Sequence, residues 1–108
     1  MDIEALEKML AGGADNAMLR FTLGKACFDL EQYATAVMHL EEAVRQDAQY
    51  SAAWKWLGRA LERAGELERA AETFRKGIEA ARQKGDRQAE KEMAVFLRRV
   101  EKQQGKTQ

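Results

Sequence analysis

The chain has 108 residues, a formal net charge of zero, one cysteine and no proline. This length allows one domain with a buried core. The lone Cys27 excludes an internal disulfide, and no stretch is long and apolar enough to span a bilayer or to act as a secretory signal. We therefore expect a cytoplasmic protein without a membrane partner.

Periodicity of the apolar residues predicts an all-α chain of about six helices and no strand. In chain order the expected helices cover Ile3 to Leu10, Asp15 or Asn16 to Leu30, Tyr33 to Gln46, Ser51 to Ala64, Leu67 to Lys84 and Arg87 to Gln103. Asp2, Asp15 or Asn16, and Ser51 are the expected N-caps. Because the connections are short, consecutive helices should be antiparallel. Residues 104–108 are expected to form a polar tail.

Each expected helix carries an apolar stripe at helical spacing. The stripes consist of Ile3, Leu6, Met9 and Leu10; Leu19, Leu23, Ala26, Cys27 and Leu30; Tyr33, Ala36, Val37, Leu40, Ala43 and Val44; Trp54, Leu57 and Leu61; Leu67, Ala70, Ala71, Phe74 and Ile78; and Ala89, Met93, Phe96, Leu97 and Val100. We expect these residues to be buried.

Two of the stripes repeat at a spacing of 34 residues. Leu23-Gly24 returns as Leu57-Gly58, and Leu40 returns as Phe74. A mid-helix glycine costs about 1 kcal/mol relative to alanine, so something must offset that cost. We expect a close crossing with the next helix, where Ala36 and Ala70 supply matching small residues and large residues such as Leu40 and Phe74 fill the space around them.

These motifs resemble the tetratricopeptide repeat, in which W-x₂-L-G in one helix is followed by A-x₃-F in the next. Trp54-x-x-Leu57-Gly58 and Ala70-x₃-Phe74 match closely, whereas Arg20 replaces the tryptophan of the earlier unit. The resemblance implies a right-handed α-solenoid of antiparallel helix pairs. It also implies a single domain over residues 1–108, with a half-repeat at 1–16, repeats at 17–50 and 51–84, and a capping helix with its tail at 85–108.

In this family the first helices of successive repeats line a concave groove that holds a peptide. Trp54 and Trp56 are separated by about 200° of helix rotation, so if Trp54 packs against the small residues, Trp56 faces the groove. The expected peptide-binding groove residues are Phe21, Lys25, Phe28, Lys55, Trp56, Arg59 and Arg63. Aromatic anchors beside cations suit a peptide or protein partner with an acidic group or a free carboxylate. The alternative is that neighbouring helices pack against Phe21 and Phe28 and that the C-terminal capping helix partly covers Trp56.

Some members of the family hold chaperone tails with lysines and asparagines at set groove positions. This chain does not reproduce that clamp, because Phe21, Lys25 and Trp56 occupy the corresponding positions. His39 is expected on the surface and Cys27 in the core as an inert thiol. With no metal-ligand cluster or nucleophile motif, we expect no enzyme activity, no cofactor and no metal.

Charge is unevenly distributed along the chain. Residues 1–50 contain 4 basic and 9 acidic residues, a net charge of −5, and residues 51–108 contain 14 and 9, a net charge of +5. Opposite halves could dock head to tail, so a self-assembling homo-oligomer is the alternative function. The basic run from Arg98 to Lys106 is interpreted as a solvated helix face, and no nucleic-acid partner is expected, because glutamates are interspersed.

Overall fold

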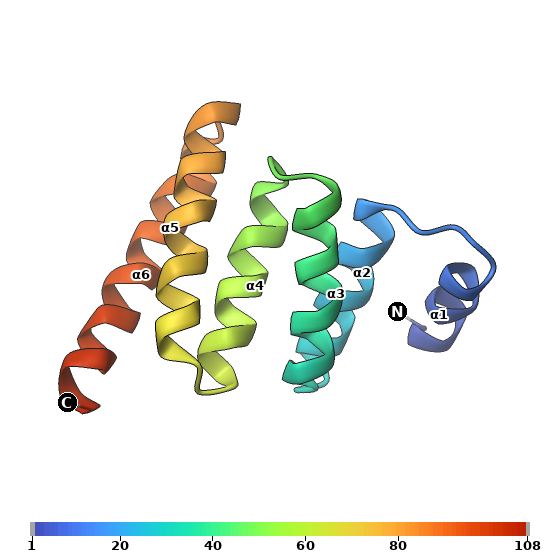
Figure 1. Ribbon diagram of the computed structural model, residues 1–108, viewed down its shortest axis with the longest axis horizontal. Helices are drawn as coiled ribbons and strands as arrows, with labels where there is room; N and C mark the ends of the chain where they lie inside the picture. Colours follow the sequence, from blue (N-terminus) through green and yellow to red (C-terminus); the bar gives the residue numbers. More distant parts are fainter. Residues whose placement is uncertain (1, 108) are drawn as a thin grey trace.

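The computed structural model describes residues 2–107, and this part of the chain contains six α-helices and no strand. The helices are α1 (Ile3–Ala11), α2 (Ala17–Asp29), α3 (Tyr33–Gln46), α4 (Ser51–Arg63), α5 (Leu67–Lys84) and α6 (Arg87–Thr107). They follow one another along the longest axis of a body of 44 × 30 × 19 Å (Figure 1). The predicted all-α class is confirmed. No helix in this range has the length and apolar character that crossing a membrane requires.

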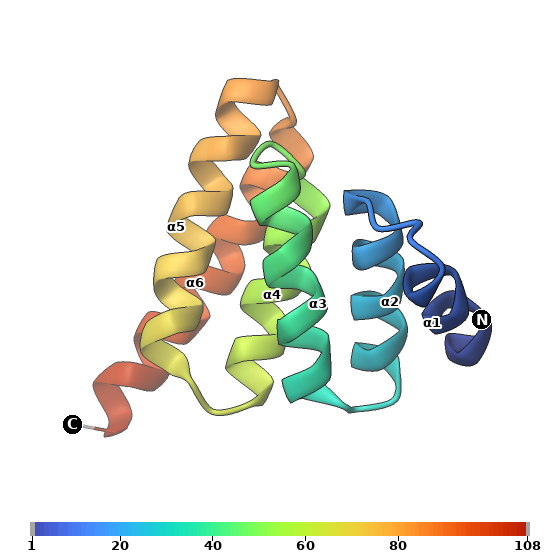
Figure 2. The ribbon, with the colours of Figure 1, turned by 45° about the vertical axis from the view of Figure 1, so that its right-hand side comes forward.

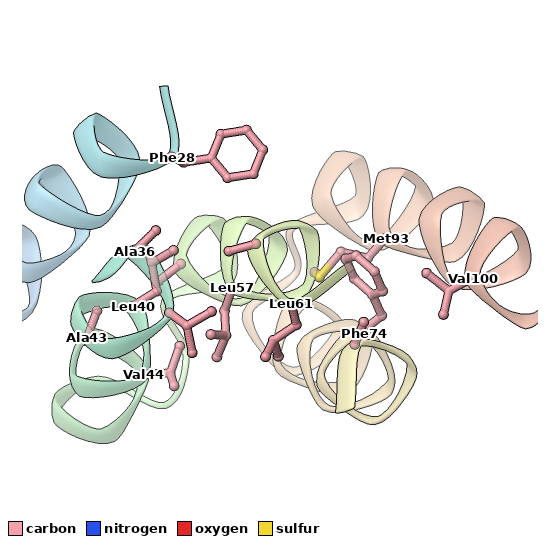
Figure 3. Packing of buried hydrophobic residues seen from close by; sticks show 14 of the residues in the cluster. Phe28, Ala36, Leu40, Ala43, Val44, Leu57, Leu61, Phe74, Met93 and Val100 are labelled. Atoms are coloured by element: carbon pink, nitrogen blue, oxygen red, sulfur yellow. The ribbon is translucent and has the colours of Figure 1, made fainter. Parts of the chain in front are cut away.

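The core runs continuously from α2 to α6 along the predicted stripes. Leu23, Leu40 and Phe74 are completely buried, and Met93 and Val100 of α6 complete the core at its far end (Figure 3). Burying a side chain of this size stabilises the fold by about 1.5–3 kcal/mol. The apolar period therefore identified the buried faces of α2 to α6 correctly at most positions.

The mid-helix glycines allow close helix crossings, and large side chains fill the space beside them, as expected. A Cβ atom on Gly24 would lie 2.5 Å from Leu40 Cγ, and one on Gly58 would lie 2.6 Å from Phe74 Cδ1. The atoms nearest to each glycine therefore belong to the large residue of the next helix, a knob-and-hole contact, and Ala36 and Ala70 are fully buried as well. The missing side chain is a hole, and the large residue of the next helix occupies it.

Two stripe predictions fail at the N-terminal end of the chain. Leu30 is 60% exposed and Met9 is 52% exposed, and α1 contains no buried residue. Helix α1 packs only against α2, at one end of the row of helices (Figure 2). Because a terminal helix has a neighbour on one side only, its apolar stripe is covered in part.

Two helix ends also differ from the predictions. Ser51 is not an N-cap: it is the first residue of α4, and its hydroxyl donates to Asp86 Oδ2 at 2.6 Å. Asp86 in turn accepts from the Ala89 backbone N–H at 3.1 Å, so this carboxylate joins the starts of α4 and α6. The predicted polar tail is helical to Thr107, and Gln108 lies outside the described residues.

His39 is buried rather than on the surface, with only 5% of its area exposed. Arg20 Nη1 donates to His39 Nδ1 at 3.2 Å, and Arg20 also makes two 2.9 Å hydrogen bonds to Asp15. Arginine has donors only, so Nδ1 must be the acceptor of a neutral ring. Burial, with a smaller contribution from the Arg20 charge, lowers the pKa of His39 below its ordinary 6.5. Thr73, which lies one 34-residue period after His39, is buried too, so this position of the repeat faces the interior.

We expect stability to fall when the pH drops from 7.5 to 5.5, because His39 takes up a proton more readily in the unfolded chain. Because the pKa of His39 in the folded protein is below 6.5, its contribution to stability is complete above pH 6.5. This contribution is lost as the pH falls from 6.5 toward the folded pKa, with a slope of at most about 1.4 kcal/mol per pH unit. Chemical denaturation at the two pH values measures this difference.

The control for this titration is His39→Asn, which keeps an acceptor for Arg20 but cannot be protonated. His39 is the only histidine, so this variant should show almost no change in the midpoint of unfolding between the two pH values. An equal loss of stability in the variant and the parent would contradict the assignment.

Candidate functional site

Trp56 is the centre of a cluster that α2 and α4 form on the side away from Trp54. Its ring meets the edge of Phe28 with the ring centroids 5.1 Å apart. Three cations surround the indole: Lys25 Nζ lies 4.4 Å from the ring centroid, Lys55 Nζ 5.5 Å and Arg59 Cζ 4.8 Å. The structure thus brings together five of the seven predicted groove residues at one point.

Trp54 points to the opposite side of α4, as the rotation between the two tryptophans requires. Its indole N–H donates to the Ala48 carbonyl at 2.8 Å, and its Cβ lies beside Gly77 of α5. It is half-buried rather than fully enclosed, because it also lines an open pocket of about 320 Å³ between α3 and α5. Trp54 is therefore a packing residue with one exposed edge.

Arg59 is the cation that the cluster holds most firmly. Its guanidinium carbon lies 5.4 Å from the Phe28 ring centroid, 4.8 Å from that of Trp56 and 4.9 Å from that of Phe96. Its Nε is buried and has no hydrogen-bond partner within residues 2–107. Burial, reinforced by the nearby positive charge of Arg63, lowers the pKa of the guanidinium below its ordinary value. The cluster therefore contains a partly buried cation to which it supplies no carboxylate.

The other cations differ in how far they are neutralised. Lys25 pairs with Asp29 at 2.9 Å and Lys55 pairs with Glu92 of α6 at 3.1 Å. Arg63 has no ion pair in the described part of the chain, and its Nη1 instead donates to the Tyr33 hydroxyl at 3.0 Å. Positive charge that is free to attract an anion is thus concentrated on the Arg59 side of Trp56.

Two of the predicted groove residues have a different role from the one expected. Phe28 is only 8% exposed, so it supports the indole and the guanidinium from below instead of offering a free surface. Figure 3 shows its ring extending from α2 over α4. Phe21 lies apart from the cluster and packs against Tyr50, with ring centroids 5.0 Å apart. It reaches the cluster through Lys25, with which it lines a shallow pocket of about 130 Å³.

The whole arrangement is referred to below as the aromatic–basic surface. It consists of Lys25, Phe28, Lys55, Trp56, Arg59, Arg63 and Phe96, with Phe21 at its edge. A surface of this kind can bind a chain segment through ring contacts and charge-assisted hydrogen bonds.

A sequence model described as "Tetratricopeptide repeat" matches residues 21–85, which is more than half of the chain. The chain belongs to the tetratricopeptide repeat family. A Pseudomonas aeruginosa relative, "TPR repeat-containing protein PA0015", is 51% identical over 102 residues, covering 94% of this chain and 97% of the relative. The resemblance drawn from Leu57-Gly58 and Ala70-x₃-Phe74 is therefore confirmed.

Solved structures show the same tetratricopeptide repeat architecture. The solution structure of protein BPP2914 from Bordetella parapertussis has a TM-score of 0.82 and 46% identity, covering 95% of this chain and 90% of that one. The second tetratricopeptide repeat domain of human RPAP3, in complex with the HSP70 peptide SGPTIEEVD, has a TM-score of 0.77 and 24% identity, covering 92% and 78%. The human domain shows likeness of fold alone.

Sequence reasoning placed Phe96 in the core and did not connect it with Arg59. The repeat period could have indicated this role, because Phe96 lies two periods of 34 residues after Phe28 and therefore occupies the equivalent position. Phe96 also stacks on Phe74, with ring centroids 5.7 Å apart, so it links the core to the surface. Tyr33 was assigned to a buried stripe, and its hydrogen bond to Arg63 could not be read from spacing.

Cys27 is 2% exposed, and burial raises the pKa of its thiol. An uncharged, enclosed thiol is a poor nucleophile and metal ligand. Residues 2–107 contain no group of three or more histidine, cysteine, aspartate or glutamate side chains that could hold a metal ion. In this tetratricopeptide repeat domain the aromatic–basic surface remains the candidate functional site.

Proposed function

We propose that this chain is a non-catalytic interaction module, an adaptor that binds a peptide or protein segment on the aromatic–basic surface. The observation that carries the proposal is Arg59, a guanidinium held among three aromatic rings without a carboxylate partner. Such a cation is oriented in advance, so a ligand that pairs with it does not have to order it.

The ligand that suits this surface has an acidic side chain or a free carboxylate next to an apolar group. The carboxylate would pair with Arg59 and Arg63, and the apolar group would lie on the exposed face of Trp56. In support, the peptide SGPTIEEVD, with which the human RPAP3 domain forms its complex, carries acidic residues at its end. The binding residues here differ from the lysine and asparagine clamp of some family members, so the partner need not be the same.

We expect Arg59→Glu to weaken binding of a partner by at least about a hundredfold, since it removes an attraction and adds a repulsion at the centre of the site. The partner is identified by affinity capture with the parent protein. Its purified binding segment is then titrated against the parent, Arg59→Glu and Trp56→Ala by calorimetry, with circular dichroism to verify the fold.

Arg75→Glu is the matched control. It makes the same charge change at an exposed arginine of α5, 56% accessible and paired with Glu101. Arg59→Lys is a second comparison, because it keeps the charge but loses the planar group that stacks on Trp56. Unchanged affinity in folded Arg59→Glu and Trp56→Ala, or an equal loss in Arg75→Glu, would remove the site from the aromatic–basic surface.

A further inference from the structure

The outward side of α6 carries a straight row of exposed cations that is separate from the aromatic–basic surface. Its members are Arg87, Lys91, Arg98, Lys102 and Lys106, with Val95 among them, 57% exposed. At about 100° per residue these six positions fall within an arc of about 100°, and at 1.5 Å per residue they span about 28 Å. This set is called the basic stripe below.

No member of the basic stripe forms an ion pair within residues 2–107. The glutamates of α6 lie on its flanks and pair with other helices: Glu92 with Lys55 of α4, Glu90 with Arg82 of α5, and Glu101 with Arg75 of α5. The acidic residues of α6 thus pair with neighbouring helices, whereas the outward cations of α6 have no ion pair within residues 2–107.

We propose that the basic stripe docks an acidic α-helix of another protein, which lies along α6 and seats one apolar side chain against Val95. The stripe is about as wide as the contact face of one helix, and its cations recur about once per turn, the spacing at which a partner helix presents one face. Complementary charge along such a row speeds association and orients the partner, and the apolar contact with Val95 sets the register.

Two other occupants fit the stripe less well. A nucleic acid is much wider than the stripe, so its phosphates would also meet the carboxylates of Glu90, Glu92 and Glu101, and its backbone offers no apolar contact for Val95. The first helix of a second copy matches the stripe poorly, because Glu4 and Glu7 of α1 are followed at once by Lys8. If the basic stripes of two copies packed against each other, like charges would lie side by side.

The test uses a synthetic helical peptide of about 20 residues, with glutamates along one face around a central leucine, as the probe. A scrambled peptide of the same composition and a short DNA duplex accompany it. Fluorescence anisotropy measures the affinity of the full chain for each at low and at high salt. We expect saturable, salt-dependent binding of the faced peptide, at least about tenfold tighter than that of the scrambled peptide.

The triple variant Lys91→Gln, Arg98→Gln and Lys102→Gln should weaken this binding by at least about tenfold. A control triple variant, Arg45→Gln, Arg75→Gln and Lys76→Gln, makes the same change in net charge at exposed cations that are ion-paired within the chain, and it should retain the affinity. Val95→Ala should weaken peptide binding several-fold. Arg59→Glu should leave it unchanged, which distinguishes this site from the aromatic–basic surface.

Three results would overturn the proposal. One is equal loss of affinity in the two triple variants, which would show attraction by net charge alone. The second is tighter binding of duplex DNA than of the faced peptide. The third is concentration-dependent self-association that the stripe variant abolishes, which would assign the stripe to a second copy of the chain.

Discussion

Phe74→Ala should lower the free energy of unfolding by about 3–5 kcal/mol, a large part of the total stability of a domain of this size. Phe74 is completely buried, fills the space beside Gly58 and stacks on Phe96. Its loss leaves a cavity where α4, α5 and α6 meet. Urea denaturation followed by circular dichroism measures the change.

Phe74→Leu is the conservative comparison, because Leu40 occupies the corresponding position one repeat earlier. It keeps most of the buried volume and should cost about 1–1.5 kcal/mol. A loss of less than about 1.5 kcal/mol in Phe74→Ala would mean that the knob-and-hole contact with Gly58 is not a main source of stability.

Gly77→Ala should be destabilising by up to about 2 kcal/mol, although alanine is the better helix former. The new Cβ would lie 2.5 Å from Met93 Sδ and 2.7 Å from Trp54 Cβ. Met93 can move, but the Trp54 Cβ is fixed to the backbone of α4. Overpacking strain of about 1–3 kcal/mol therefore opposes a gain in helix propensity of about 1 kcal/mol. Thermal or urea denaturation measures the result, and Gly77→Val should cost more.

Gly105→Ala is the internal control for this prediction. It lies in α6, and among the described residues a Cβ added there would meet no atom within 4 Å beyond its own stretch of helix. The substitution should therefore show the propensity gain alone, a few tenths of a kcal/mol to about 1 kcal/mol. If Gly77→Ala stabilised the protein as Gly105→Ala is expected to do, the close contact of α5 with Trp54 would be disproved.

The fold could be predicted because it depends on two regular features of the sequence. The apolar period gives the buried face of each helix, and the 34-residue repeat gives the pairing of helices. Leu40 and Phe74 show how far this reaches, since their equivalence predicts two similar crossings. Spacing alone could not show which of the residues expected around each crossing come nearest to the glycines, and these are Leu40 and Phe74. That depends on the direction of each Cα–Cβ bond at the crossing.

The candidate site was predicted less completely. The rotation between Trp54 and Trp56 correctly separated the two faces of α4. Spacing could not reveal that Asp29 and Glu92 neutralise two lysines while Arg59 has no ion pair within residues 2–107, because ion pairing depends on which side chains reach one another across helices. His39 was misassigned for a related reason: spacing could not show that Arg20, which stands where Trp54 stands in the next repeat, gives the buried ring a polar partner.

The stepwise packing of the helices has a consequence for how this chain folds. In the described part of the chain every packed pair of helices is adjacent in sequence or separated by one helix, so contacts are local throughout. Chains with such low contact order close only short loops on the way to the native state and fold in microseconds to milliseconds. Folding can begin at any of the helix pairs and spread to its neighbours. The end pair, α1 against α2, should contribute least to that spread, because α1 has no buried residue, and we expect it to open first in native-state hydrogen exchange.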